Sequence, residues 1–143
     1  MRSNALPKQK SGFTLIELMI VVIIIGVLAG LAIPRFIKTA EKVRGEKAVS
    51  SLSLILTGES MYMLDYNEFA NDLDLLARYI FIGEFASDPN WTYGDPDITD
   101  DPADPGPDFT AIATRSGGVY SGGTITIDED GNISTGGDWP FTY

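Results

Sequence analysis

The chain has 143 residues, a formal net charge of −10, and neither cysteine nor histidine. A chain of this length has room for one small core, and without Cys or His it lacks disulfides, the commonest thiol nucleophile and the commonest general base, so we expect no enzyme. Beyond Lys47 the only basic residues are Arg78 and Arg115; this acidic part is therefore unsuited to direct electrostatic binding of nucleic acid.

Residues 1–12 form a basic leader. The leader has three basic residues and no acidic one, and it ends at Gly12, directly before the apolar Phe13. A secretory signal peptide would carry its cleavage site after the apolar region, at small residues, and no good site of that kind is present there. The leader is therefore expected to be a cytoplasmic basic tail, and its composition is compatible with a cut between Gly12 and Phe13.

Residues 13–33 form an apolar run in which Glu17 is the only ionisable side chain. A helix of about 20 apolar residues spans a bilayer, so this segment is predicted to be a transmembrane helix. A carboxylate at the centre of such a helix costs roughly 2.5 to 3.5 kcal/mol, which predicts a cationic partner for Glu17. No Lys or Arg lies within the run, and the nearest candidate is a new amino terminus at Phe13. A plain signal anchor with Glu17 near the interface is the alternative.

The stretch Lys10-Ser-Gly-Phe-Thr-Leu-Ile-Glu-Leu18 resembles the class III signal of type IV pilins and type II secretion pseudopilins. The resemblance implies that a prepilin peptidase cuts after Gly12 and methylates the new amine of Phe13. It implies that Glu17, the fifth residue of the mature chain, neutralises the amine of a neighbouring subunit during assembly. Gly26 and Pro34 match a glycine and a proline that weaken the helix in many pilins.

Among these relatives the chain is most similar to short, Cys-free type IV major pilins. That similarity implies a structural subunit of a homopolymeric helical filament, held in the inner membrane as a precursor and passed by the pilus assembly machinery to the cell surface. One alternative is a type II secretion pseudopilin that forms a short periplasmic pseudopilus. The other alternative is a monomeric, membrane-anchored binding module.

Residues 34–66 continue the helix outward. Apolar residues recur there at helical intervals among charged ones, which predicts an amphipathic spine. Asn71 and Asp72 are candidate caps for a second helix over Leu73–Ile80. Residues 67–143 are expected to form an acidic globular head around this helix and the segments that follow it.

Residues 88–108 are rich in Pro and Asp, which predicts a loop because repeated Pro blocks both a helix and a central strand. Flexible acidic loops suit Ca²⁺, and Asp95, Asp97, Asp100 and Asp101 are weak candidate ligands; a solvated surface loop without metal is the preferred interpretation. We expect no other cofactor.

Residues 109–143 show the alternation of an antiparallel meander. Strands are predicted over 109–115, 123–128 and 133–135, with a hairpin turn at Asp130-Gly131. Trp139, Phe141 and Tyr143 are expected to close this sheet onto the helix. The predicted fold class is therefore α+β: a long N-terminal helical spine, half apolar and half amphipathic, packed against a small antiparallel sheet.

Overall fold

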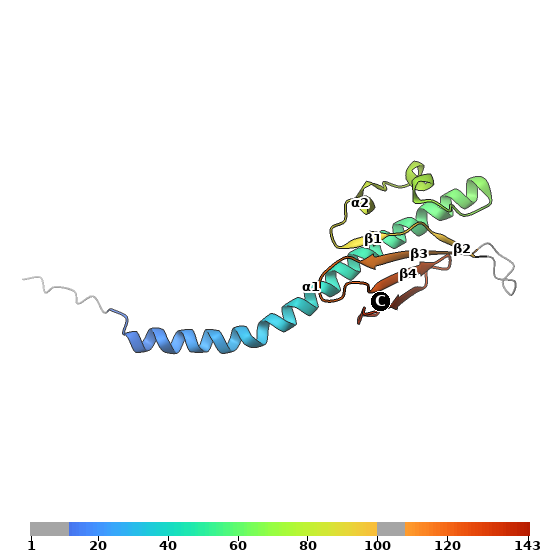
Figure 1. Ribbon diagram of the computed structural model, residues 1–143. Coiled ribbons are helices and arrows are strands. Elements are labelled where there is room, and N and C mark those ends of the chain that lie inside the picture. The colour runs from blue at the N-terminus through green and yellow to red at the C-terminus, as the bar shows by residue number, and fades with distance from the viewer. Residues whose placement is uncertain (1–11, 100–107) are drawn as a thin grey trace, which may run out of the picture. The chain divides into compact units, whose positions relative to one another are not determined.

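The computed structural model describes residues 12–99 and 108–143. The chain divides into two compact units, residues 1–39 and 40–143. The elements run in the order α1 (Leu15–Tyr66), the 3₁₀ helix η1 (Leu73–Arg78), α2 (Gly83–Ala86), β1 (Trp91–Tyr93), β2 (Asp97–Thr99), β3 (Asp108–Arg115), β4 (Thr124–Asp128) and β5 (Ile133–Gly136) (Figure 1). This arrangement confirms the α+β fold class.

The first unit contains the apolar part of α1. This part is long and apolar enough to cross a membrane, and no residue of its most apolar window is buried. Pro34 lies inside the helix, which continues without a break on either side of it. The large apolar side chains of this segment are thus exposed over the whole helix surface instead of along one stripe.

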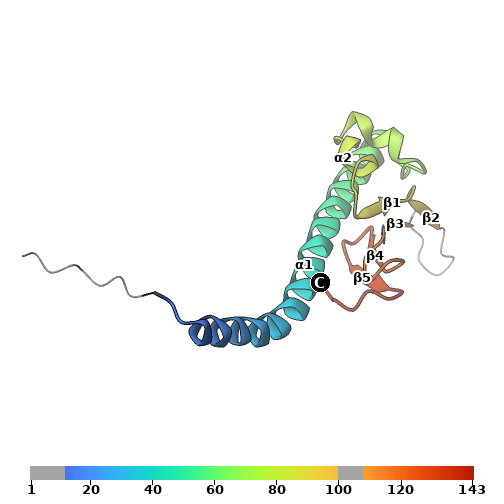
Figure 2. The ribbon, with the colours of Figure 1, turned by 60° about the vertical axis from the view of Figure 1, so that its left-hand side comes forward.

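The second unit contains the rest of α1, which buries one stripe of side chains against the sheet. The stripe includes two acidic residues, and its members are Glu41, Gly45, Ala48, Leu52, Ile55, Gly58 and Glu59. Spacings of three and four residues place these positions on one face of a helix. Figure 2 shows this part of α1 lying along the sheet. The core forms where Leu52 and Ile55 meet Phe109 and Ile125.

The sheet is antiparallel, with strand order β1-β3-β4-β5 and with β2 also paired to β3. In β3, Phe109, Ala111, Ala113 and Arg115 are buried while the intervening residues are partly exposed. This period of two is the pattern of a strand with one face on the core. The predicted meander of three strands is confirmed by β3, β4 and β5, each within two residues of its expected bounds.

The prediction of an uninterrupted loop over residues 88–108 is wrong in part, because β1 and β2 lie within it. Both strands pair with the same edge of β3: Trp91 is opposite Arg115, and Asp97 is opposite Thr110. Neither three-residue strand contains Pro. Pro96 lies just before β2, an edge position at which the missing backbone N–H of Pro is tolerated. A strand of three residues is too short to show a clear alternation of apolar and polar residues in the sequence. Its formation depends on hydrogen bonds to β3.

The predicted helix over Leu73–Ile80 is shorter and tighter than expected, a 3₁₀ helix that ends at Arg78. Its predicted cap is present: Asp72 Oδ1 accepts a hydrogen bond from the backbone N–H of Asp74 at 2.8 Å. The segment serves as a connector between α1 and α2, a place where 3₁₀ turns are frequent, although its six residues exceed the usual length of such a run.

The C-terminal aromatic residues pack on the sheet and on α1, as predicted. The Trp139 ring lies edge-on to Trp91, with ring centroids 5.0 Å apart, and 5.2 Å from Phe141. The Tyr143 hydroxyl donates a hydrogen bond to the carbonyl oxygen of Lys42 at 3.3 Å. The final segment of the chain is therefore fastened to α1 near the start of the second unit.

Candidate functional site

The proposed cleavage position precedes the first turn of α1. Gly12, Phe13 and Thr14 are outside the helix, and 83% of Phe13 is exposed. A Cβ added at Gly12 would meet no atom within 4 Å. The Gly12–Phe13 peptide bond is therefore not covered by the described part of the chain, as proteolysis requires.

Thr14 and Glu17 form a reciprocal pair at the start of α1. The backbone N–H of Glu17 donates to Thr14 Oγ1 at 3.3 Å, and Glu17 Oε2 accepts from the backbone N–H of Thr14 at 3.3 Å. The Thr14 hydroxyl also donates to Glu17 Oε2 at 3.2 Å. This is a capping box, in which two backbone donors of the first turn gain side-chain acceptors.

The capping box adds a local role for Glu17 to the predicted intermolecular one. Sequence analysis missed Thr14, although a Thr followed three residues later by Glu just before an apolar run is the signature of this motif. The pair holds the carboxylate close to the residue that follows Phe13. A negative charge at a helix N-terminus is also favoured by the helix dipole.

Gly26 and Pro34 both lie inside α1 as the structure has it. No atom lies within 4 Å of a Cβ built at Gly26. A Pro within a helix removes one backbone donor and crowds the preceding turn. The role of these two residues as weak points of the helix in a filament stays a prediction.

Two of the four candidate calcium ligands lie among the described residues. Asp95 Oδ1 accepts a hydrogen bond from the backbone N–H of Leu73 at 3.2 Å, and Asp97 begins β2. Asp100 and Asp101 lie outside the described residues. Within residues 12–99 and 108–143 no group of three or more acidic side chains is arranged to hold a metal ion. The calcium site stays a prediction.

The chain from Asp128 to Asn132 forms a turn, as its composition predicts. Asp128 Oδ1 accepts from the backbone N–H of Asn132 at 2.7 Å, and its Oδ2 accepts from the Asn132 amide at 3.0 Å. Gly131 has a φ of +82°, a conformation that favours glycine. The oxygen atoms of Asp128 are thus occupied by the turn itself.

A buried ion pair joins α1 to β3 in the second unit. Arg115 Nε donates to Glu41 Oε2 at 2.9 Å, and only 4% of each side chain is exposed. Arg115 Nη1 also donates to the carbonyl oxygen of Asn90 at 2.7 Å. Arg44, one turn further along α1, forms a second ion pair with Glu41. The Arg115 hydrogen bond holds the pKa of the Glu41 carboxyl below its ordinary value.

A second ion pair lies close by, between α1 and the segment before β1. Lys47 Nζ is 2.8 Å from Asp88 Oδ2, and the Asp88 side chain is 1% exposed. Burial raises the pKa of Asp88, but the Lys47 ammonium and two backbone N–H donors outweigh this, and the net pKa is lowered. Sequence analysis counted these charges without pairing them, since partners 41 and 74 residues apart leave no pattern along the chain.

Glu59 is a buried carboxyl without a cation. Its side chain is fully buried, and Oε2 accepts from the backbone N–H of Ala70 at 2.8 Å. No group within the described residues bonds Oε1. Burial raises the pKa of Glu59 to about 7. Sequence analysis missed this residue because it saw only one more polar position on an amphipathic helix.

The outward face of α1 in the second unit carries an apolar stripe. Val43, Leu54 and Met61 are 58%, 38% and 43% exposed. Their spacings of 11 and 7 residues are close to three and two helical turns, so the three side chains share a face. They point away from the buried stripe and are available for contact with another molecule.

Comparisons with known proteins agree with the sequence motif. A family model described as a prokaryotic N-terminal methylation motif matches residues 7–33. The chain is 33% identical over 139 residues to the type II secretion system core protein G of Escherichia coli, covering 94% of this chain and 92% of that protein. It is 33% identical over 124 residues to the type IV major fimbrial protein FimA of Dichelobacter nodosus, covering 87% and 69%.

A third relative matches over a shorter region. The chain is 41% identical over 76 residues to the type IV major pilin protein PilA of Myxococcus xanthus, covering 51% of this chain and about a third (34%) of that protein. No solved structure matches the chain. The relatives matched over most of their length thus include both a secretion protein and a fimbrial protein.

Proposed function

Because the chain belongs to the family of type IV pilins and type II secretion core protein G, we propose that it is the structural subunit of a type IV pilus filament. The precursor is inserted in the inner membrane with residues 13–33 as its span and residues 34–66 as its amphipathic continuation. A prepilin peptidase removes residues 1–12 and methylates Phe13. Assembly machinery then adds the subunit to a filament at the cell surface.

The observation that carries the proposal is the exposed apolar surface of α1. None of the most apolar window of this helix is buried within the described chain. Complete burial of one large apolar side chain is worth about 1.5 to 3 kcal/mol, so this surface requires an apolar environment from outside the chain. Lipid supplies it before assembly, and the same helix of neighbouring subunits supplies it in the filament.

Glu17 supplies register in this proposal. Its carboxylate is expensive in an apolar helix bundle unless a cation approaches it. The amine of Phe13 in a neighbouring subunit is such a cation, and the capping box keeps Glu17 close to the helix end. The Val43, Leu54 and Met61 stripe extends the contact surface of α1 into the second unit.

A type II secretion pseudopilin is the second candidate. The match to the E. coli core protein G over 92% of that protein favours it. Its filament would be short and periplasmic, and its loss would stop secretion without removing surface fibres. Both candidates assign the chain a structural role rather than a catalytic one.

The first experiment is mass spectrometry of the protein from surface-sheared material of its native host. A chain that begins at N-methylated Phe13 in sheared fibres is the expected result. Correct processing without fibres would favour the pseudopilin. An intact leader on an unassembled membrane protein would overturn both candidates in favour of a monomeric anchored module.

Variants of the capping box test the assembly role of Glu17. Glu17→Ala removes the carboxylate and the two hydrogen bonds that it accepts from Thr14, while the backbone N–H at position 17 can still donate to Thr14 Oγ1. We expect insertion and cleavage to persist while filaments are lost. Thr14→Ala is the matched control, because it removes the Thr14 side-chain bonds, worth about 1 kcal/mol, and keeps the charge. Filaments should persist in Thr14→Ala. Equal loss in both variants would assign Glu17 to helix capping alone, and normal filaments in Glu17→Ala would contradict the docking role.

A further inference from the structure

A helical filament of identical subunits needs two different surfaces on each subunit. In a head-to-tail contact that does not close into a ring, one patch of each copy meets a different patch of the next. The inference below rests on the proposed filament. It concerns the second unit of the chain, where uncompensated charges of opposite sign lie on different elements.

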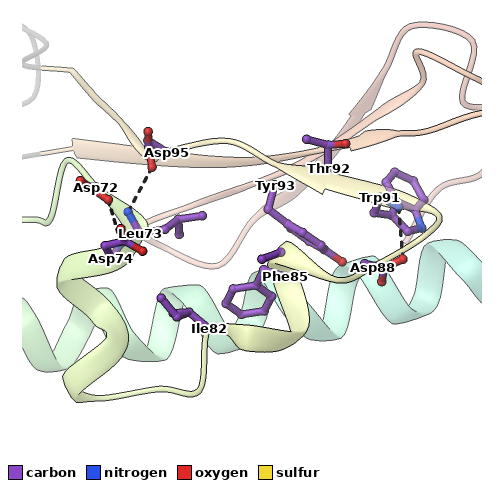
Figure 3. Close-up of a pocket in the computed structure, with 11 residues that line it drawn as sticks. Asp72, Leu73, Asp74, Ile82, Phe85, Asp88, Trp91, Thr92, Tyr93 and Asp95 are labelled. Carbon is purple, nitrogen blue, oxygen red and sulfur yellow. Dashed lines mark hydrogen bonds between the residues drawn. The ribbon is translucent and has the colours of Figure 1, made fainter.

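A groove of about 470 Å³ lies in the second unit, between the η1–α2 segment and β1. Figure 3 shows Asp72, Asp74 and Asp95 gathered at one end, with Ile82 and Phe85 along the groove. The Phe85 ring stacks at a tilt against Tyr93, with centroids 5.2 Å apart. The groove therefore combines an apolar wall with an acidic end.

Within residues 12–99 and 108–143, no cation pairs with the acidic end. Asp72 and Asp95 each accept a backbone N–H, from Asp74 and Leu73 respectively. None of the three carboxylates takes part in an ion pair among the residues that the structure describes. A cation with an apolar stem would complement both parts of the groove, because such a side chain covers apolar surface with its methylenes while its charge reaches the carboxylates.

The far end of the same groove already receives a lysine. Asp88 lines the groove and pairs with Lys47 of α1 at 2.8 Å. This pair shows that a lysine carried on α1 matches a carboxylate of the groove wall. The Asp72–Asp74–Asp95 end lacks the corresponding lysine.

Lys42 is a cation that could complement the acidic end of the groove in another copy of the chain. It is exposed on α1, and among the described residues it forms no ion pair. Its neighbour Val43 is 58% exposed, so the Lys42 region presents a cation beside apolar surface. The Tyr143 hydroxyl donates to the Lys42 carbonyl and thereby ties the C-terminal segment to this turn.

We propose that the groove between η1–α2 and β1 is a docking site for a second copy of this chain, and that Lys42 of the neighbouring copy occupies its acidic end. The lysine stem lies along Ile82 and Phe85, and its ammonium lies among the three carboxylates. Because groove and lysine are different surfaces, each copy offers both, and the contact propagates along the filament.

Charge reversal tests the contact. Asp74 is the position to change: Asp72 caps η1, whereas the Asp74 side chain forms no hydrogen bond with the part of the chain that the structure describes. Since an exposed pair is worth up to about 1 kcal/mol, Asp74→Lys and Lys42→Asp should each reduce sheared filaments by up to about fivefold. The combined variant should recover most of the loss. Asp130→Lys, an equal charge change in the exposed β4–β5 turn, is the matched control and should assemble normally.

Cysteine crosslinking gives an independent readout, because the chain has no cysteine of its own. Because the lysine stem keeps the two Cα atoms beyond the roughly 7 Å reach of a disulfide, the crosslinker is a bismaleimide longer than a lysine side chain. Asp74→Cys combined with Lys42→Cys should then give a ladder of crosslinked oligomers in treated filaments, and each single variant, as well as Asp130→Cys with Lys42→Cys, should not. Filaments that assemble without a ladder, or a charge-reversed pair that does not recover, would overturn this inference alone. Absence of filaments from the unaltered chain would overturn the proposed function instead.

Discussion

The two halves of α1 have the same regular backbone and opposite environments. Residues 15–39 expose apolar side chains on every face, while the part in the second unit buries one stripe against the sheet. Glu17 in the first half is exposed, and within the described residues its carboxylate accepts hydrogen bonds from Thr14 alone. Glu41 in the second half is buried and forms an ion pair with Arg115. The first half therefore depends on partners outside the chain, whereas the buried stripe of the second half packs within its own unit.

This difference separates assembly from folding. Changes in the exposed half should alter insertion or polymerisation and leave the head folded. Changes in the buried stripe should unfold the head, and affect assembly only as a consequence. In the detergent-solubilised full-length chain, which is unassembled, the free energy of unfolding of the head can be measured without a contribution from assembly.

The largest expected effect comes from Arg115→Ala. Removal of Arg115 leaves the buried Glu41 carboxylate with the part-exposed Arg44 as its remaining ion-pair partner among the described residues, so we expect a loss of about 3 kcal/mol of unfolding free energy, the low end for a broken buried pair. Denaturant unfolding of the head, followed by tryptophan fluorescence, measures it. Arg78→Ala, at an exposed arginine, should change stability by less than about 0.5 kcal/mol. A double change of Glu41 and Arg115 to Leu should recover most of the loss; a small effect of Arg115→Ala would show that water reaches Glu41.

Glu59 should make the head less stable as pH rises. Burial raises its pKa from 4.5 to about 7, so between these values the folded state binds a proton that the unfolded state has released. Stability then falls as pH increases through this window and levels off above it. One pKa unit corresponds to about 1.4 kcal/mol, which gives roughly 3 kcal/mol in total.

The control is Glu59→Gln, which keeps an acceptor for the N–H of Ala70 and cannot ionise. The difference in unfolding free energy between this variant and the unaltered chain should grow from pH 4.5 to 7 and then stay constant. Groups such as Asp88 contribute equally to both proteins and cancel. Parallel pH profiles of the two proteins would contradict the raised pKa.

The smallest expected effect distinguishes two glycines of α1. A Cβ at Gly45 would lie 1.8 Å from Tyr143 Oη and 2.4 Å from a ring carbon of Trp139, whereas at Gly30 it would meet nothing. Overpacking costs about 1 to 3 kcal/mol and the helix gains about 1 kcal/mol from Ala, so Gly45→Ala should destabilise the head by up to about 2 kcal/mol.

Gly30→Ala is the matched change in the exposed half, and it should leave head unfolding unaltered. Trp139 emission is the readout, because the C-terminal segment must move away from α1 to admit a methyl group at position 45. An equal response of the two variants would mean that Gly45 acts only through helix propensity. An increase in stability for Gly45→Ala would mean that Tyr143 moves aside freely.

Much of the fold could be predicted because it depends on local periodicity. Alternation along β3 and β4 and the Asp130-Gly131 turn are repeated signals over neighbouring residues. The β1 and β2 strands could not be predicted in this way, because three residues carry little alternation and their pairing depends on the edge of β3. The capping box was within reach of sequence reasoning, since Thr14 and Glu17 are three residues apart.

The sequence by itself determined the apolar helix, its single carboxylate and the motif around Gly12 and Phe13. Each is a pattern of neighbouring residues, and its consequence follows from how apolar and charged groups are solvated. Only the tertiary structure decided which charges are paired. Glu41 meets Arg115 and Lys47 meets Asp88 across long stretches of chain, and Gly45 leaves space for Tyr143. Such contacts follow from packing α1 on the sheet, and packing joins residues that share no spacing along the sequence.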